Sequence, residues 1–221
     1  MSRANGILLE TERLILRRVT LADLDQMASI NGDPEVMRYI GDGSLWTRMQ
    51  SEARIRRILK VYELFPGLGL WIGEEKSSRR FVGAYALIYI PKTVEVEVGY
   101  RLQKSAWGRG LATEGARALV RYGMFELGLD RVVGLTHPDN AASKHVLMKS
   151  GLQRSGMGNY YDKQLCYFVA EKPTSSAGAA PDTPPTTKTA KRNRGDTDVV
   201  TGLGPFAQQW NRGKHRQHRH Q

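Results

Sequence analysis

A glycine-bearing turn is the stretch of this sequence whose residue types most directly suggest ligand binding: residues 105–114, SAWGRGLATE. Apolar residues at helical spacing follow it, so the turn comes at the start of a predicted helix. Main-chain N–H groups at a helix start lack partners, the helix dipole favours negative charge there, and glycine lets a phosphate approach the main chain closely. The turn therefore predicts an anion site, although short glycine patterns also begin ordinary helices.

Two carboxylates precede the turn on a predicted strand at residues 94–102. Apolar and polar residues alternate along this strand, which places Glu95 and Glu97 on one face and three valines on the other. Because the valines are the natural core side, the carboxylates face either a cleft or solvent. A carboxylate in a cleft can take a proton as a general base, whereas one on a wet sheet face is an ordinary surface acid. Both alternatives stay open here.

The elements that position these residues follow from the same patterns. The strand at 94–102, a helix at 111–128 and a strand at 131–136 form a unit that makes one parallel strand pair. The other predicted elements are a strand at 7–17 broken near Glu12, a helix at 21–30, a short turn at 33–41, a helix after Thr47, strands at 70–73 and 81–89, a helix at 141–150 and a strand at 165–170. The predicted fold class is a mixed α/β domain: a mostly antiparallel sheet with one parallel pair, flanked by helices.

The predicted helix after Thr47 is basic on the side opposite its apolar stripe. The basic residues are Arg48, Arg54, Arg56, Arg57 and Lys60. Such a cluster is typical of a solvated helix face, and it can also border a substrate groove.

Composition limits the class of protein and of site. The 221 residues carry a net charge of +11, which favours an anionic partner such as a phosphate-bearing cofactor or an acidic substrate. Cys166 is the only cysteine, and neither His137 nor His145 has a carboxylate or thiol at ligand spacing, so we expect no metal. The sequence has no run of about 18 apolar residues and no signal-peptide pattern. We therefore expect a cytoplasmic protein with no membrane association.

The composition changes abruptly beyond Lys172. Residues 173–221 are rich in Pro, Thr, Ser and Ala and then basic; eight Lys or Arg and three Asp place +5 of the net charge there. Such a segment lacks the apolar surface needed to fold. We predict one folded domain at 6–172 and a disordered basic tail at 173–221. The tail is either solvated or makes a weak, salt-sensitive contact with nucleic acid or the ribosome.

Three segments together resemble the GNAT superfamily of acyl-CoA-dependent N-acyltransferases. Its signature is Gln/Arg-x-x-Gly-x-Gly/Ala, and residues 107–112 (WGRGLA) match it except that Trp107 replaces the usual Gln or Arg. Residues 140–152 and 9–17 resemble two further segments of the branch that contains the ribosomal-protein alanine N-terminal acetyltransferases. Three segments in the family's order and spacing are more specific than any one of them.

The resemblance implies that the strand around Val98 to Leu102 splays from the strand at 131–136, and that the pantetheine arm of acetyl-CoA pairs with the freed edge. The residues implied in binding acetyl-CoA are Tyr100, Leu102, Trp107, Gly108, Arg109, Gly110, Leu111, Ala112, Thr113 and Asn140. The Arg109 side chain either pairs with a phosphate or is exposed to solvent, and Asn140 caps the following helix, binds the cofactor, or does both.

The resemblance also implies catalytic roles. Glu97 matches the Glu-x-Gly-Tyr pattern of the branch and lies nearer the splay than Glu95, so Glu97 is the implied general base. The tyrosine that many members carry seven residues after Asn140 is Leu147 here. The branch suggests Ser143 as the acid instead, with a purely helical role as the alternative. Three tyrosines are reserve acids: Tyr160, Tyr161 and Tyr167.

These features predict an enzyme that moves an acetyl group from acetyl-CoA to a primary amine by direct attack in a ternary complex. The acceptor is a protein N-terminus or a small molecule such as a polyamine or amino sugar. Because Leu147 replaces the usual tyrosine, the alternative is a catalytically inactive acyl-CoA-binding sensor or interaction module.

Overall fold

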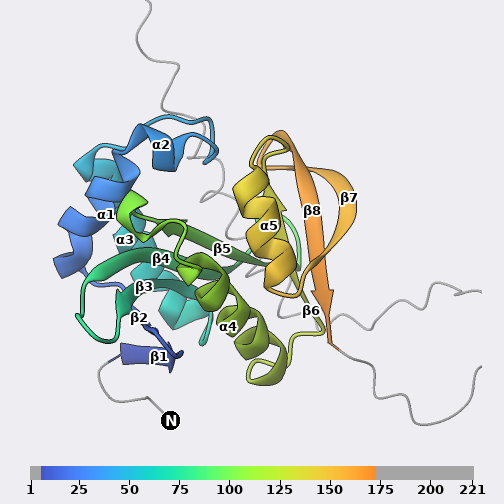
Figure 1. Ribbon diagram of the computed structural model, residues 1–221, viewed down its shortest axis with the longest axis horizontal. Coiled ribbons are helices and arrows are strands. Elements are labelled where there is room, and N and C mark those ends of the chain that lie inside the picture. The colour runs from blue at the N-terminus through green and yellow to red at the C-terminus, as the bar shows by residue number, and fades with distance from the viewer. Residues whose placement is uncertain (1–5, 173–221) are drawn as a thin grey trace, which may run out of the picture. The chain divides into compact units, whose positions relative to one another are not determined.

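The computed structural model describes residues 6–172, which form an eight-stranded sheet with flanking helices (Figure 1). The strands are β1 (Ile7–Glu10), β2 (Leu14–Arg18), β3 (Gly69–Glu75), β4 (Phe81–Tyr89), β5 (Val96–Leu102), β6 (Arg131–Thr136), β7 (Gln153–Tyr160) and β8 (Lys163–Glu171). The helices are α1 (Leu24–Asn31), α2 (Pro34–Met37), α3 (Arg48–Leu64), α4 (Leu111–Phe125) and α5 (Ala141–Lys149), with short 3₁₀ turns η2 (Leu21–Asp23) and η3 (Lys104–Ala106).

The strand order in the sheet is β1-β2-β3-β4-β5-β6-β8-β7. β5 and β6 run parallel, with α4 as the connection between them. The pairs β1–β2, β2–β3, β3–β4, β6–β8 and β7–β8 are antiparallel. This topology confirms the predicted fold class, a mostly antiparallel sheet with one parallel pair.

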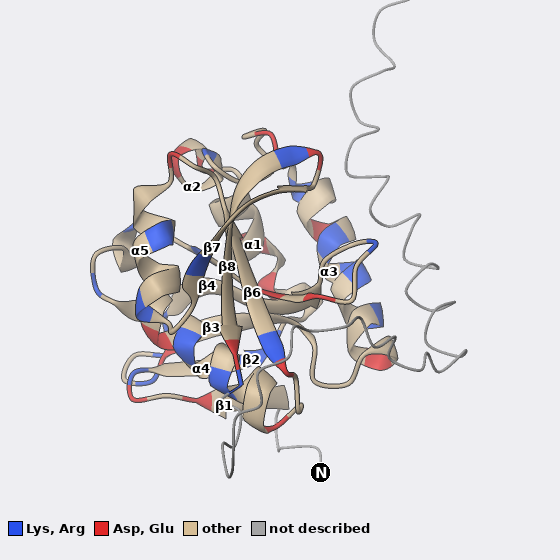
Figure 2. Cartoon of the chain, turned by 90° about the vertical axis from the view of Figure 1, so that its right-hand side faces the viewer, with Lys and Arg blue, Asp and Glu red and all other residues tan. Residues whose placement is uncertain are grey.

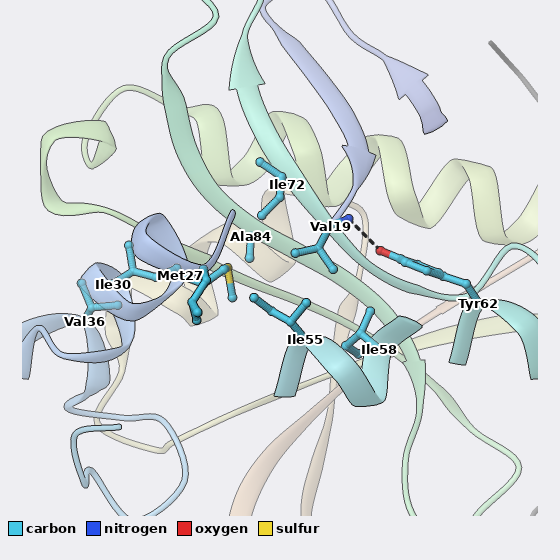
Figure 3. Packing of buried hydrophobic residues seen from close by; sticks show 10 residues of the cluster. Val19, Met27, Ile30, Val36, Ile55, Ile58, Tyr62, Ile72 and Ala84 are labelled. Carbon is cyan, nitrogen blue, oxygen red and sulfur yellow. Dashed lines mark hydrogen bonds between the residues drawn. The ribbon is translucent and has the colours of Figure 1, made fainter. Parts of the chain in front are cut away.

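One face of the sheet is covered by α1 and α3, which bury a hydrophobic cluster against β3 and β4 (Figure 3). Ile55 and Ile58 are the fully buried positions of α3 in this cluster. The Tyr62 hydroxyl accepts a hydrogen bond from the main-chain N–H of Val19 at 3.0 Å, as the dashed line in Figure 3 shows. Thr47 caps the start of the helix. This apolar stripe fixes α3 over the sheet, and with it the basic residues on the flanks of the stripe.

The other face is packed by α4, where two glycines make room for the ring of Tyr85. A Cβ on Gly115 would lie 2.2 Å from Tyr85 Cε1, and one on Gly73 would lie 2.5 Å from Cε2, so neither position accepts a side chain. The Tyr85 hydroxyl donates to the Leu111 carbonyl at 2.9 Å. This fully buried ring therefore anchors the first turn of α4, directly after the glycine turn.

Among residues 6–172, β7 is the strand that the sequence analysis did not predict. Its residues are mostly exposed and include Gly156 and Gly158, so they show no clear apolar alternation. β7 pairs with β8 through a tight turn in which Tyr161 and Asp162 have φ values of 54° and 59°, the backbone that two-residue hairpins favour. The prediction that Val94 faces the core was wrong, because its side chain is 80% exposed and β5 begins at Val96.

No helix within residues 6–172 is long and apolar enough to cross a membrane. The predictions made for residues 173–221, a disordered tail and a nucleic-acid or ribosome contact, lie outside the described residues.

Candidate active site

Glu97, the residue implied as a general base, lies in the parallel pairing of β5 with β6. Glu97 pairs with Val133 across the two strands. Two residues further along β6, the main-chain N–H of Leu135 donates to the Glu97 carboxylate. A side chain of β5 thus takes a main-chain donor of β6.

Burial raises the pKa of Glu97 to about 7. Loss of water around the carboxylate is the largest cause. The Tyr161 hydroxyl, which donates at 2.7 Å, the Leu135 N–H and the positive charge of Arg54 all lower the pKa, and together they do not cancel the effect of burial. Glu97 is half-buried and remains accessible. A carboxylate with a pKa near 7 can both accept and release a proton at neutral pH, as a general base must.

Glu95 lies on the same face of the chain but in a different setting. Its carboxylate accepts hydrogen bonds from Tyr167 at 2.6 Å and from Tyr160 at 3.2 Å, and Arg131 lies 3.5 Å away. The two tyrosine rings stack with centroids 5.7 Å apart. Glu95 therefore ties the start of β5 to β6 and the β7–β8 hairpin, and it engages two of the three reserve acids.

Tyr100 and Ser143 form a hydroxyl pair between β5 and α5. Their oxygens lie 3.0 Å apart, and the Tyr100 hydroxyl also donates to the Ser143 carbonyl at 3.1 Å. Burial raises the pKa of Tyr100, and the charge of Glu97 raises it further, so the phenol keeps its proton at neutral pH. Asn140 caps α5 by accepting from the Ser143 N–H at 3.0 Å, which confirms the capping role.

The glycine turn, the predicted anion cradle, lies directly before α4. Gly108 and Gly110 have φ values of 72° and 77°, and a Cβ on Gly108 would meet no atom within 4 Å. Gly110 is the residue before α4 and offers no side chain to cap the N–H groups of residues 111–113. Trp107 closes the turn on its other side, since its indole N–H donates to the Leu102 carbonyl at 2.9 Å. Open space beside uncapped N–H groups fits a phosphate.

A network of charged residues holds the turn in place. Arg13 donates to the Arg109 carbonyl at 3.0 Å and forms an ion pair of 2.6 Å with Glu114 in the first turn of α4. The Arg109 side chain forms an ion pair with the Glu75 carboxylate. The network engages the Arg109 side chain, while the main-chain N–H groups at the start of α4 have no side-chain cap. A phosphate contact by the Arg109 side chain stays a prediction.

α3 presents basic residues at intervals along its length (Figure 2), and one of them, Arg54, acts on Glu97 electrostatically. Burial and, to a lesser extent, the charge of Arg57 lower the pKa of Arg54 to about 10, although Tyr161 and Glu97 act in the opposite direction. Arg56, two residues away, is 61% exposed and pairs with Glu52 on the same helix. The basic helix is thus solvated at Arg56 and borders the candidate site at Arg54.

No group of three His, Cys, Asp or Glu side chains within residues 6–172 could hold a metal ion. The two side chains that act on Glu97 and that sequence reasoning did not assign to it are Arg54 and Tyr161. They come from α3 and from the β7–β8 turn, more than 40 positions away in either direction. Arg54 directly precedes the buried Ile55 and so lies at the border of the apolar stripe of α3. This position was the sequence signal that could have identified Arg54 as a site residue.

Replacing Glu97 by glutamine should stabilise the protein at alkaline pH. The pKa of the folded state, about 7, lies above the ordinary 4.5. Between these values the folded protein binds more protons than the unfolded chain, so its free energy of unfolding falls as pH rises through this window. Glutamine does not titrate. Allowing for the accessible part of the carboxylate, we expect a gain on the order of 1–2 kcal/mol at pH 8 relative to pH 4.

Thermal unfolding of both proteins at the two pH values measures this gain. An equal difference in melting temperature at pH 4 and pH 8 would contradict the raised pKa of Glu97.

Comparison with known proteins shows the family of this chain. A family model described as an acetyltransferase (GNAT) domain matches residues 13–153. YoaA, an uncharacterized N-acetyltransferase of Bacillus subtilis (strain 168), is 30% identical over 155 residues, which are 70% of this chain and 87% of that protein. The FsC-acetyl coenzyme A-N(2)-transacetylase of Aspergillus fumigatus is 33% identical over 152 residues, 65% of this chain and 64% of that protein.

A solved structure shows the same fold. It is RimL, a ribosomal L7/L12 alpha-N-protein acetyltransferase in complex with coenzyme A, and it matches with a TM-score of 0.63 at 14% identity. The match covers 75% of this chain and 97% of that one.

Proposed function

Because this chain belongs to the GNAT acetyltransferase family, we propose that Glu97 is the general base with which it acetylates a primary amine. The protein is an acetyl-CoA-dependent N-acetyltransferase, and the thioester of acetyl-CoA supplies the acetyl group. One observation carries the proposal: the half-buried Glu97 carboxylate, in the β5–β6 pairing, accepts hydrogen bonds from the Tyr161 hydroxyl at 2.7 Å and from the Leu135 N–H, and its burial raises its pKa. Glu97 as a base and the Tyr100–Ser143 hydroxyl pair as a proton donor together favour an active enzyme over an inactive acyl-CoA-binding module.

The two substrates would reach Glu97 from opposite faces of the sheet. Alternation along β5 places Glu97 on the face covered by α3, with Arg54 nearby, and Tyr100 on the face where α5 lies. The glycine turn begins α4, which packs against Tyr85. In this proposal the N–H groups of residues 111–113 hold the pyrophosphate, and the amine enters from the α3 side. Such an arrangement suits direct attack in a ternary complex.

The residues of the chain would divide the proton transfers between them. Glu97 takes the proton of the ammonium, which frees the nitrogen lone pair to form the new N–C bond as the C–S bond breaks. Ser143 and Tyr100, whose hydroxyls lie 3.0 Å apart, donate a proton or a hydrogen bond to the departing sulfur. Tyr161 orients the base through its 2.7 Å hydrogen bond.

A panel of amines tests the proposal and its alternatives. Similar proteins include an α-N-protein acetyltransferase and an N(2)-transacetylase, so the panel should contain peptide N-termini, amino acids, amino sugars and polyamines. Release of free CoA measures turnover. Binding of acetyl-CoA without turnover on any amine would favour the inactive module.

Replacing Tyr161 by phenylalanine should move the acidic limb of the kcat/KM profile to higher pH. The Tyr161 hydroxyl stabilises the charged form of Glu97, so its loss raises the pKa of the base further. Tyr160→Phe is the matched control, because this neighbouring tyrosine donates to Glu95. A limb that moves equally in both variants, or in neither, would contradict the assignment.

A further inference from the structure

We infer that the amine acceptor also carries an anionic group, a carboxylate or a phosphate, which Arg101 and Arg54 bind while Glu97 receives the amine. The inference rests on the proposed function of Glu97 and specifies the class of its substrate.

β5 carries both the base and the arginine of such a site on one face. Glu97, Gly99 and Arg101 are at alternate positions, so they lie on the same side of the strand. Gly99 lies between the base and the arginine and adds no side chain to this face of the strand. A Cβ built there would find Ala86 Cβ at 3.8 Å as its contact, an ordinary van der Waals distance. The strand therefore leaves room for a ligand between a carboxylate and a guanidinium.

Neutral groups hold the Arg101 guanidinium in place. It donates to Asn31 Oδ1 and lies over the ring of Trp46, 5.0 Å from the centroid. Asn31 is fully buried and donates in turn to Ser51 Oγ at 3.0 Å. Within residues 6–172, Arg101 forms no ion pair with a carboxylate. A guanidinium has five N–H donors and the Asn31 oxygen takes one, so donors remain for a second acceptor.

The electrostatics of the pair favour an anion. Arg101 is half-buried, and its pKa is lowered to about 10 by burial and by the charge of Arg54. Arg54, from α3, acts electrostatically on both Arg101 and Glu97, the two ends of the site. Two cations kept from water near one another raise the free energy of the empty site. A carboxylate or phosphate relieves this repulsion, whereas the second ammonium of a polyamine increases it.

The spacing limits how far the anion lies from the amine. Four residues of a strand separate the Cα atoms of Glu97 and Arg101 by about 13 Å, and the two side chains shorten this span. An anion several bonds from the nitrogen fits, as in a peptide with an acidic residue next to its N-terminus. The same spacing suits a short aminoalkyl phosphate.

Matched acceptors test the inference. Alanyl-glutamate amide and alanyl-glutamine amide differ by one charge at nearly equal size. We expect kcat/KM to favour the glutamate compound by about 10- to 100-fold, as for a hydrogen bond to a charged group. Arg101→Gln should reduce this preference to near one, mainly through KM of the charged acceptor. Arg56→Gln, on the solvated side of α3, should retain it. Phosphoethanolamine against ethanolamine then tells a phosphate preference from a carboxylate one.

Arg54→Gln gives the same test if Arg101→Gln does not fold. Equal kcat/KM for both members of each pair in the wild-type enzyme would overturn the inference, as would a preference that survives both arginine variants. If no amine is acetylated, the proposed function fails. The Kd values of the matched compounds, measured by calorimetry with CoA bound, then still decide the inference: a preference for the anionic member supports it and equal values overturn it.

Discussion

Glu97→Gln should lower kcat about 100- to 10,000-fold, the range that a positioned general base typically contributes. Glutamine keeps the size of the side chain and its hydrogen-bond acceptor but cannot take the proton of the ammonium. Acetyl-CoA affinity should stay near the wild-type value, because the cradle lies at the start of α4. Steady-state kinetics and calorimetry measure the two quantities separately. The limb of the pH profile near 7 should also disappear in this variant.

Glu95→Gln is the matched control for this experiment. Glu95 is the same residue type as Glu97 and lies on the same face at the start of the same strand. Its carboxylate differs in being engaged by Tyr160, Tyr167 and Arg131. Glu95→Gln should therefore mainly lower the free energy of unfolding and should affect kcat less. A larger loss of kcat in Glu95→Gln than in Glu97→Gln would show that the other carboxylate is the base.

Gly110→Val should raise the Kd for acetyl-CoA by about 10-fold or more, which is at least about 1.4 kcal/mol of binding free energy. Gly110, the residue directly before α4, has a φ of 77°, where a β-branched residue is strained, and a Cβ there would lie 3.4 Å from the Arg13 guanidinium. The side chain would occupy the space that a pyrophosphate needs. Calorimetric titration with acetyl-CoA measures the loss.

Gly128→Val separates backbone strain from loss of the cradle. Gly128 follows the other end of α4, has a φ of 71°, and a Cβ there would meet no atom within 4 Å. Both variants therefore carry similar strain, and only Gly110→Val should lose acetyl-CoA affinity. Unchanged affinity in Gly110→Val, or an equal loss in both variants, would reject the cradle.

The features that the sequence determined by itself are local in origin. Alternation identified β5 and the buried positions Val96 and Val98, because a strand exposes successive side chains to opposite faces. The glycine turn before α4 was recognisable because two glycines before an amphipathic helix specify positive φ and uncapped N–H groups. The fold class followed from the order of such elements, with α4 joining two parallel strands. β7 was not predicted from the sequence because its residues show no apolar alternation. It is a strand because it pairs with β8.

Only the tertiary structure separated Glu97 from Glu95. Alternation puts both carboxylates on one face, so sequence reasoning without the family resemblance could not rank them. The ranking comes from partners that the fold brings from elsewhere: Tyr161 and Arg54 at Glu97, and Tyr167 at Glu95. The ionisation of a carboxylate depends on the water it loses and the charges it gains, and both are set by residues distant in sequence. The reactivity of Glu97 is for that reason a property of the folded chain.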